Sequence, residues 1–168
     1  FYQYRPTPDA PSRWGHEMSE GDPFSWLDCN DVIVPVGGET AVRAGTLASA
    51  DDGLDLFFTS ATAAGNTIQI AHVAHVDHLC ADLDEEEELQ VAKAATRLGA
   101  VVEDTAGAAN FRSPCVVPDW GSADREQDHD GWLMLAVSGP VTAPKPVVLT
   151  STDGRDWHLV GPLTFDGD

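Results

Sequence analysis

Short runs of apolar residues recur along the chain, separated by Gly, Pro, Asp and Asn. Two runs, at 54–60 and 132–137, are almost wholly apolar, which is typical of strands buried on both faces. The separating residues favour turns, so the pattern predicts an all-β fold of short strands. We expect strands at residues 31–36, 42–49, 54–60, 67–73, 100–103, 131–138, 146–152 and 157–161.

A weak internal repeat links these strands. Each of the Asp-Gly pairs at 52–53 and 130–131 precedes an apolar strand that ends in a serine at the same spacing. A turn that begins with Asp and closes with Trp four residues later occurs at 22–26 and again at 153–157. Asp-Gly suits tight hairpins, and repetition of short antiparallel sheets is typical of a β-propeller.

Blades of about 40–50 residues divide this chain into about three. We therefore expect one domain, residues 1–168, with blades of roughly 1–37, 38–107 and 108–168. The first blade is expected to be incomplete, since the Phe-Tyr-Gln-Tyr run at 1–4 reads as the middle of a sheet.

One segment departs from strand chemistry. Residues 84–88 are all acidic and precede a stretch rich in Ala, Lys and Arg. Acidic residues at the positive end of a helix are favourable, so a short helix is expected within 82–98. The alternative is a solvated connector on the rim of the propeller, and neither reading places an active site there.

The 168 residues carry a net charge of −19, which disfavours nucleic acid and anionic membrane surfaces as partners. No apolar run is long enough to span a bilayer. Cys29, Cys80 and Cys115 have no CxxC spacing, so we expect buried free thiols, and a weak preference for the cytoplasm follows. The chain begins at Phe1, so we expect an incomplete N-terminus.

The residues at 110–114, Asn-Phe-Arg-Ser-Pro, resemble the Asn-Phe-Arg-Asp-Pro motif of glycoside hydrolase family 32, the β-fructosidases, with Ser113 in place of aspartate. Residues 1–6 resemble that family's F-Y-Q-Y-N-P, and residues 14–19 its W-G-H-A-x-S. Weaker matches follow in the same order at 44–46, 56–60, 68–71, 130–134 and 151–163. The resemblance covers most of the chain.

This resemblance implies a five-bladed propeller that hydrolyses β-fructofuranosides such as sucrose or fructans with retention. Such chemistry requires a carboxylate nucleophile and a carboxylic general acid. In the family pattern the nucleophile would precede Phe1 and the acid would follow Asp168. The third family carboxylate falls at Ser113, which can donate a hydrogen bond but carries no charge. We therefore expect this chain alone to be catalytically incompetent, and no catalytic residue is assigned.

The substrate-binding residues that the resemblance implies are Gln3, Trp14, Arg112 and Ser113. Gln3 and Trp14 would face a sugar ring, and Arg112 would bind its hydroxyl groups. The structural alternatives are a backbone-bonding amide for Gln3, core packing for Trp14, and an arginine that ties two blades together for Arg112. The loop before Trp14 is short compared with the family pattern, so its role stays open.

Other chemistry receives little support. His72, His75 and His78 recur every three residues near Cys80, but strand alternation would send His72 and His75 to opposite faces. There is no G-x-S-x-G elbow, G-x-G-x-x-G or P-loop. We expect no metal and no cofactor. The hypotheses are a β-fructosidase-like glycosidase, a non-catalytic carbohydrate-binding or structural propeller module, and a module that binds partners through exposed sheets; self-association through blade edges is expected.

Overall fold

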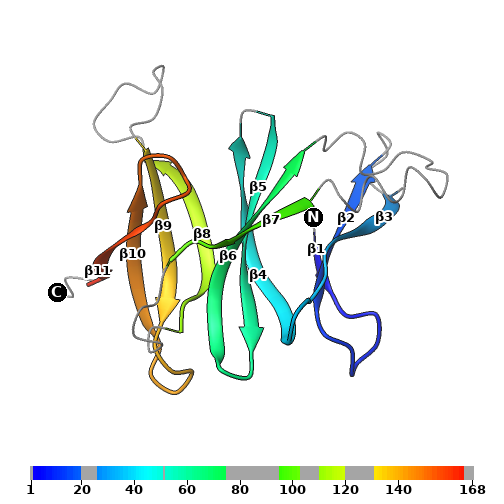
Figure 1. Ribbon diagram of the computed structural model, residues 1–168, viewed down its shortest axis with the longest axis horizontal. Helices are drawn as coiled ribbons and strands as arrows, with labels where there is room; N and C mark the ends of the chain where they lie inside the picture. Colours follow the sequence, from blue (N-terminus) through cyan, green and yellow to red (C-terminus); the bar gives the residue numbers. More distant parts are fainter. Residues whose placement is uncertain are drawn as a thin grey trace.

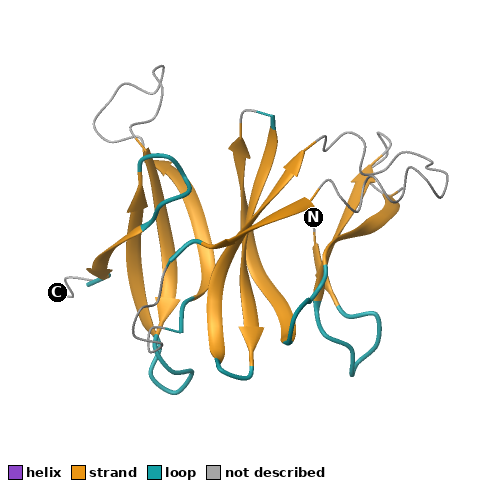
Figure 2. Cartoon of the chain, viewed as in Figure 1, coloured by secondary structure: helices purple, strands orange, loops and turns teal. Residues whose placement is uncertain are grey.

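The computed structural model describes residues 2–19, 26–50, 52–74, 95–102, 110–119 and 131–164. Every regular element in these ranges is a β-strand, and the strands form three antiparallel sheets that stand side by side (Figures 1 and 2). The all-β partial propeller predicted from the sequence is confirmed. Among the described residues there is no helix long and apolar enough to cross a membrane.

The first sheet has the order β1-β2-β3, and the second the order β4-β5-β6-β7. The third runs β8-β9-β10-β11. Strands β4 and β8 lie at the edges where the second and third sheets approach each other (Figure 1). The strands are β1 Tyr2–Tyr4, β2 Arg13–Ser19, β3 Trp26–Ile33, β4 Glu39–Ala50, β5 Gly53–Thr62, β6 Gly65–Ala74, β7 Ala95–Ala100, β8 Arg112–Asp119, β9 Gly131–Ser138, β10 Lys145–Ser151 and β11 His158–Pro162.

Two hydrophobic clusters hold the sheets together. One joins the first and second sheets around Trp14, Leu56 and Phe58. The other joins the second and third sheets around Phe57 and Met134. Because Phe57 and Phe58 are adjacent on β5, they point to opposite faces of the central sheet, one into each cluster. The apolar run of β5 is thus explained by burial on both faces.

The predicted helix is wrong over residues 95–98, because Ala95–Ala100 is the strand β7. Its Ala, Thr and Arg residues pair with β6, where Gln69 lies opposite Ala100 and His72 opposite Thr96. Long-range pairing to a sheet edge overrides helix propensity here. The remainder of the predicted helix lies outside the described residues.

The expected strand at 100–103 is wrong over residues 101–102, which form a bend, since β7 ends at Ala100. The amide of Val101 instead donates to the carbonyl of Ile68, and its side chain is buried in the cluster around Phe57. Cys115 is exposed and free, which corrects the expectation of a buried thiol there. The side chains of Cys29 and Cys80 lie outside the description.

Candidate functional site

A line of hydrogen bonds connects the three sheets through strands β1, β4, β5 and β8. The amide oxygen of Gln3 on β1 accepts from the backbone N–H of Ala44 on β4 at 2.9 Å. The hydroxyl of Thr59 on β5 donates to the Ala44 carbonyl at 3.4 Å, and it accepts from the Ser113 N–H of β8 at 2.8 Å. We call Gln3, Ala44, Thr59 and Ser113 the inter-sheet seam.

Two β-bulges create the seam. The register of β4 shifts between Arg43 and Gly45, and Ala44 there has a positive φ of 23°. The register of β8 shifts between Arg112 and Cys115, and Ser113 has a φ of 55°. A bulge releases a residue from the ladder and re-aims its backbone, and bulges are frequent beside functional sites. Here each bulge turns a backbone N–H toward a side chain of the neighbouring sheet.

Of the expected site residues, the structure brings Gln3 and Ser113 to this seam. Ser113 is exposed and its hydroxyl is not needed for the seam, which uses only its backbone N–H. Gln3 is exposed as well, although its carbonyl oxygen is already engaged by Ala44. The seam therefore leaves the Ser113 hydroxyl and the Gln3 NH₂ group as polar groups that a ligand can reach.

Arg112 is half-buried, and its Nη1 donates to the carbonyl oxygens of Gly139 at 2.6 Å and Asn110 at 3.1 Å. Both acceptors lie in the third sheet or its loops, so Arg112 does not tie two blades together. That task falls to Asn110, whose side-chain oxygen accepts from the backbone and side-chain nitrogens of Asn66 at 2.8 and 2.7 Å. This role of Asn110 was not expected from the sequence; the φ of 46° there is one that asparagine tolerates well.

Trp14 makes no side-chain hydrogen bond to the seam residues and is part of the hydrophobic core. It is only 9% exposed and packs in the cluster between the first and second sheets. A Cβ at Gly45 would stand 3.1 Å from the Trp14 ring and 2.4 Å from the Phe57 carbonyl oxygen. The indole thus lies against the bulge of β4, and its enclosed Nε1 has no hydrogen-bond partner.

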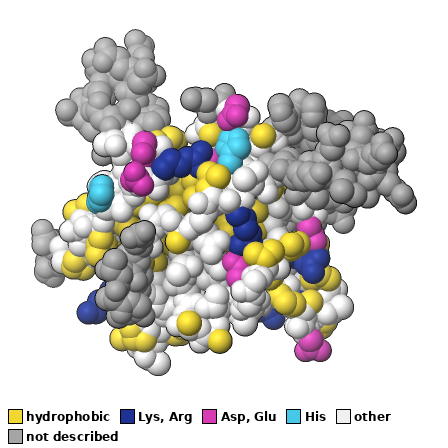
Figure 3. All heavy atoms as spheres, in the orientation of Figure 1, with side chains coloured by type: hydrophobic (Ala, Val, Ile, Leu, Met, Phe, Trp, Pro, Cys, Tyr) yellow, Lys and Arg dark blue, Asp and Glu magenta, His cyan; other side chains and the backbone are white. Residues whose placement is uncertain are grey.

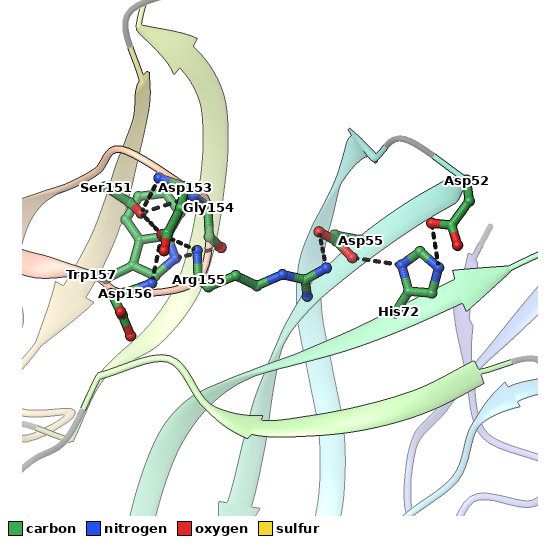
Figure 4. A network of polar contacts seen from close by, with 9 residues as sticks. All are labelled: Asp52, Asp55, His72, Ser151, Asp153, Gly154, Arg155, Asp156 and Trp157. Atoms are coloured by element: carbon green, nitrogen blue, oxygen red, sulfur yellow. Dashed lines mark hydrogen bonds and ion pairs between the residues drawn. The ribbon is translucent and has the colours of Figure 1, made fainter.

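A second polar cluster lies between the second and third sheets. Arg155, in the turn 151–157, reaches across to Asp55 on β5, and Asp55 in turn bonds His72 on β6 (Figure 4). The turn corresponds to the predicted Asp-to-Trp turn at 153–157. Oδ1 of Asp153 accepts from the N–H groups of Asp156 and Arg155 and from the Ser151 hydroxyl, and these bonds lower the pKa of Asp153. Its counterpart at 22–26 falls almost wholly outside the described residues.

Within the described ranges, no group of three or more His, Cys, Asp and Glu side chains is placed to hold a metal ion. His72 instead bonds Asp55 through Nδ1 at 3.0 Å and faces Asp52 through Nε2 at 3.2 Å. His75, His78 and Cys80 lie outside the description.

This arrangement of sheets is found in known enzymes. Similar solved structures include the GH32 β-fructofuranosidase BmSUC1 of Bombyx mori, with a TM-score of 0.59 and 18% identity, and fructan 1-exohydrolase IIa of Cichorium intybus, with 0.66 and 17%. A fructofuranosidase of Schwanniomyces occidentalis complexed with fructose matches with 0.62 and 18%. The chain has the fold of part of these enzymes. No family model matches the sequence, and no curated protein does.

The match extends over nearly the whole of this chain, 99%, 98% and 96% respectively. It spans about a third of the neighbours, covering 33%, 29% and 30% of their chains. One neighbour is complexed with fructose and another, a variant of the Bombyx mori enzyme, with sucrose.

Proposed function

We propose that this chain is a segment of a β-fructosidase-like propeller of glycoside hydrolase family 32, whose inner strands contribute one side of a sugar-binding site. The observation that supports this most is the seam, because it brings together two residues of separate family-like motifs, Gln3 and Ser113, which lie far apart in the sequence. The fold shared with fructofuranosidases supports the same proposal.

Within this site Arg112, Gln3 and Ser113 bind hydroxyl groups of a fructose-containing sugar. The Gln3 NH₂ group donates to ring hydroxyls, and the Ser113 hydroxyl both donates and accepts. Trp14 acts one layer behind them, since its ring supports the bulge that presents the Ala44 N–H to Gln3.

This chain alone binds sugar without hydrolysing it. Retaining hydrolysis requires two carboxyl groups about 5–5.5 Å apart. At the seam the position of the family carboxylate is a serine, and the partners of Gln3 and Arg112 are backbone groups. The second candidate, a non-catalytic carbohydrate-binding module, is favoured by the same serine, which retains hydrogen bonding but not charge.

The test measures binding and turnover separately. Fructose and sucrose are titrated against the chain and its Gln3→Ala, Arg112→Ala and Ser113→Ala variants, with Val141→Ala on the exposed loop between β9 and β10 as control. We expect weaker binding in the first three variants and no glucose release from sucrose by any of them. Turnover that survives Ser113→Ala but is lost in Arg112→Ala would overturn the proposal of a non-hydrolytic site.

We also propose that two copies of the chain associate. One face of the third sheet is buried around Met134 and Leu149, whereas its other face leaves Val117 and Leu135 43% and 39% exposed. The outer strand β11 adds Leu159 and Val160 at 53% and 67% exposure. Exposed apolar faces and open strand edges favour association, and hydrophobic side chains are spread over the face shown in Figure 3.

A further inference from the structure

A cavity of about 510 Å³ opens between the second and third sheets. Its walls include Ser49 at the end of β4, Asp55 and Phe57 on β5, Trp132 on β9, and Asp153 and Arg155 in the turn 151–157. This volume is within the range of small-molecule sites.

The cavity is separate from the seam. Trp132 pairs with Pro118 near the end of β8, whereas Ser113 lies near the start of that strand. Five residues of strand correspond to roughly 16 Å. The cavity therefore uses none of the residues of the proposed fructose site, and a ligand here would be a second one.

Charged groups of both signs are held in place at its wall. Asp55 is 8% exposed, and its two carboxylate oxygens bind different partners: Oδ1 bonds Nδ1 of His72 at 3.0 Å and Oδ2 bonds Nη2 of Arg155 at 3.1 Å (Figure 4). The Arg155 side chain keeps 40% exposure, although its Nη1 is enclosed and has no hydrogen-bond partner. The guanidinium is thus oriented by Asp55, and the exposed part of the side chain is open to a ligand.

The turn 151–157 supplies a second ordered carboxylate. Three hydrogen bonds to Oδ1 orient Asp153, and since they lower its pKa the group is charged near neutral pH. Trp157 closes the turn by donating from Nε1 to the Gly154 carbonyl at 3.0 Å. The Trp157 ring also meets Phe57 edge-on, with centroids 5.7 Å apart, so the turn is anchored to the second sheet.

The same cavity has an aromatic wall. The indole of Trp132 is half-buried and lies against Gly154, where an added Cβ would stand 3.3 Å from Nε1. Gly154 has a φ of 72°, which glycine adopts without strain. Phe57, only 1% exposed, contributes the floor.

These groups select a class of ligand. Two carboxylates against one guanidinium disfavour an anion, and a cation would compete with Arg155 for Asp55. Hydroxyl groups can donate to a carboxylate and accept from a guanidinium at the same time, and a ring with an apolar face can pack on an indole. The hydroxyls of Ser49 and Thr152 add further partners at the rim.

We propose that this inter-sheet cavity is a second binding site, for a neutral saccharide. Asp153 and Arg155 bind its hydroxyl groups, and Trp132 packs against its ring. Asp55 and His72 are positioning residues, since they hold the Arg155 side chain in place.

The experiment titrates the full chain with fructose, glucose and sucrose by ligand-observed NMR and calorimetry. Ser49→Trp fills the cavity from an exposed position at the end of β4, and Arg155→Met removes the charged guanidinium while keeping an unbranched stem. The surface variant Val141→Ala is the matched control, and the seam variant Ser113→Ala is measured beside it to show loss at the proposed fructose site separately. We expect at least tenfold weaker binding at the cavity in both cavity variants and unchanged binding in Val141→Ala, whereas Ser113→Ala weakens only the binding at the seam.

The three sugars distinguish a site for a monosaccharide from one that needs a disaccharide. Binding that Ser49→Trp leaves intact would overturn the proposal, as would the absence of saturable binding of all three sugars. Binding that only the Ser113 and Gln3 variants weaken would overturn the second site and support the proposed function instead. If Arg155→Met has a lower melting temperature than the wild-type chain, the binding measured with Ser49→Trp decides between the outcomes.

Discussion

The backbone N–H of Ser113 donates to the hydroxyl oxygen of Thr59 at 2.8 Å, and this bond joins the third sheet to the second. Thr59 is 2% exposed, so the bond is made at the edge of the protein interior. It also holds Ser113 at the φ of 55° that turns its side chain out of the ladder and into solvent. The backbone thus directs the side chain at position 113 toward solvent, whatever residue stands there.

The backbone at Ser113 predicts how substitutions there act. Positive φ is unfavourable for β-branched residues, so we expect Ser113→Val to lower the free energy of unfolding by about 1–2 kcal/mol. Ser113→Gly and Ser113→Asp should change it little, because glycine and aspartate tolerate this region. Thermal and urea unfolding measure the effect, with Cys115→Val on the same strand as control. Equal stability of the Val and Gly variants would contradict the bulge geometry.

Restoring the family carboxylate is a separate prediction. Ser113→Asp should bind fructose more tightly than the wild-type chain, because charge-assisted hydrogen bonds are about twice as strong as neutral ones. It should not restore hydrolysis, since one carboxylate does not supply both the nucleophile and the acid. Calorimetry and a glucose-release assay test the two halves of this prediction. Weaker binding by the Asp variant would count against Ser113 facing the sugar.

The Thr59 hydroxyl, which accepts the hydrogen bond from the Ser113 N–H, can be removed by substitution. Thr59→Val keeps the side-chain volume but leaves the Ser113 N–H and the Ala44 carbonyl without this partner. We expect a loss of about 1–3 kcal/mol in unfolding free energy. Thr59→Ser retains the hydroxyl and should lose less. If Thr59→Val unfolds at the same urea concentration as the wild-type chain, the hydrogen bond does not contribute to stability as expected.

Acid should weaken the ion pair between Glu39, at the start of β4, and Arg97 on β7. Burial alone would raise the pKa of Glu39, but hydrogen bonds from Arg97, the Ser60 hydroxyl and the Val36 N–H outweigh it and hold the pKa below its ordinary value of 4.5. Arg97 donates to Oε1 at 2.7 Å and also lies over the Phe58 ring at 5.0 Å.

A lowered folded-state pKa contributes stability above the unfolded-state pKa, and this contribution is lost as pH falls through the folded-state value. We therefore expect unfolding free energy to fall below about pH 4.5 more steeply in the wild-type chain than in Glu39→Gln. Urea unfolding from pH 3 to pH 7, with Asp9→Asn as an exposed control, measures this difference. Parallel pH profiles of the wild-type and Gln chains would contradict it.

Association should depend on the exposed face of the third sheet. Placing lysines at Val117 and Leu135 puts charge on that face, so we expect the double variant to shift toward monomer in sedimentation and light scattering. Thr142→Lys adds charge on an exposed loop and is the control. A wild-type chain that is a monodisperse monomer and binds no apolar dye would rule out the association.

Local patterns were enough to identify much of the fold. The alternating and apolar runs predicted β5, β6, β9 and β10 to within a few residues, because each of these strands buries its own side chains between sheets. The turn at 153–157 was also found, since its Asp and Trp act on backbone groups only a few residues away. The sequence missed β2, β7 and β8. Strand β7 depends on its pairing with β6, and β8 is interrupted by a bulge and two prolines.

The sequence by itself determined that this is an all-β chain built from repeated sheets, and it located the motif around Arg112 and Ser113. Only the tertiary structure decided which residues meet. Asn110, and not Arg112, connects the second and third sheets. Trp14 is buried against the β4 bulge, and Asp55 on the second sheet pairs with Arg155 of the third. The physical reason is that strand pattern follows from burial at each position, whereas contacts between sheets depend on bulges and register, which arise only when distant strands pair.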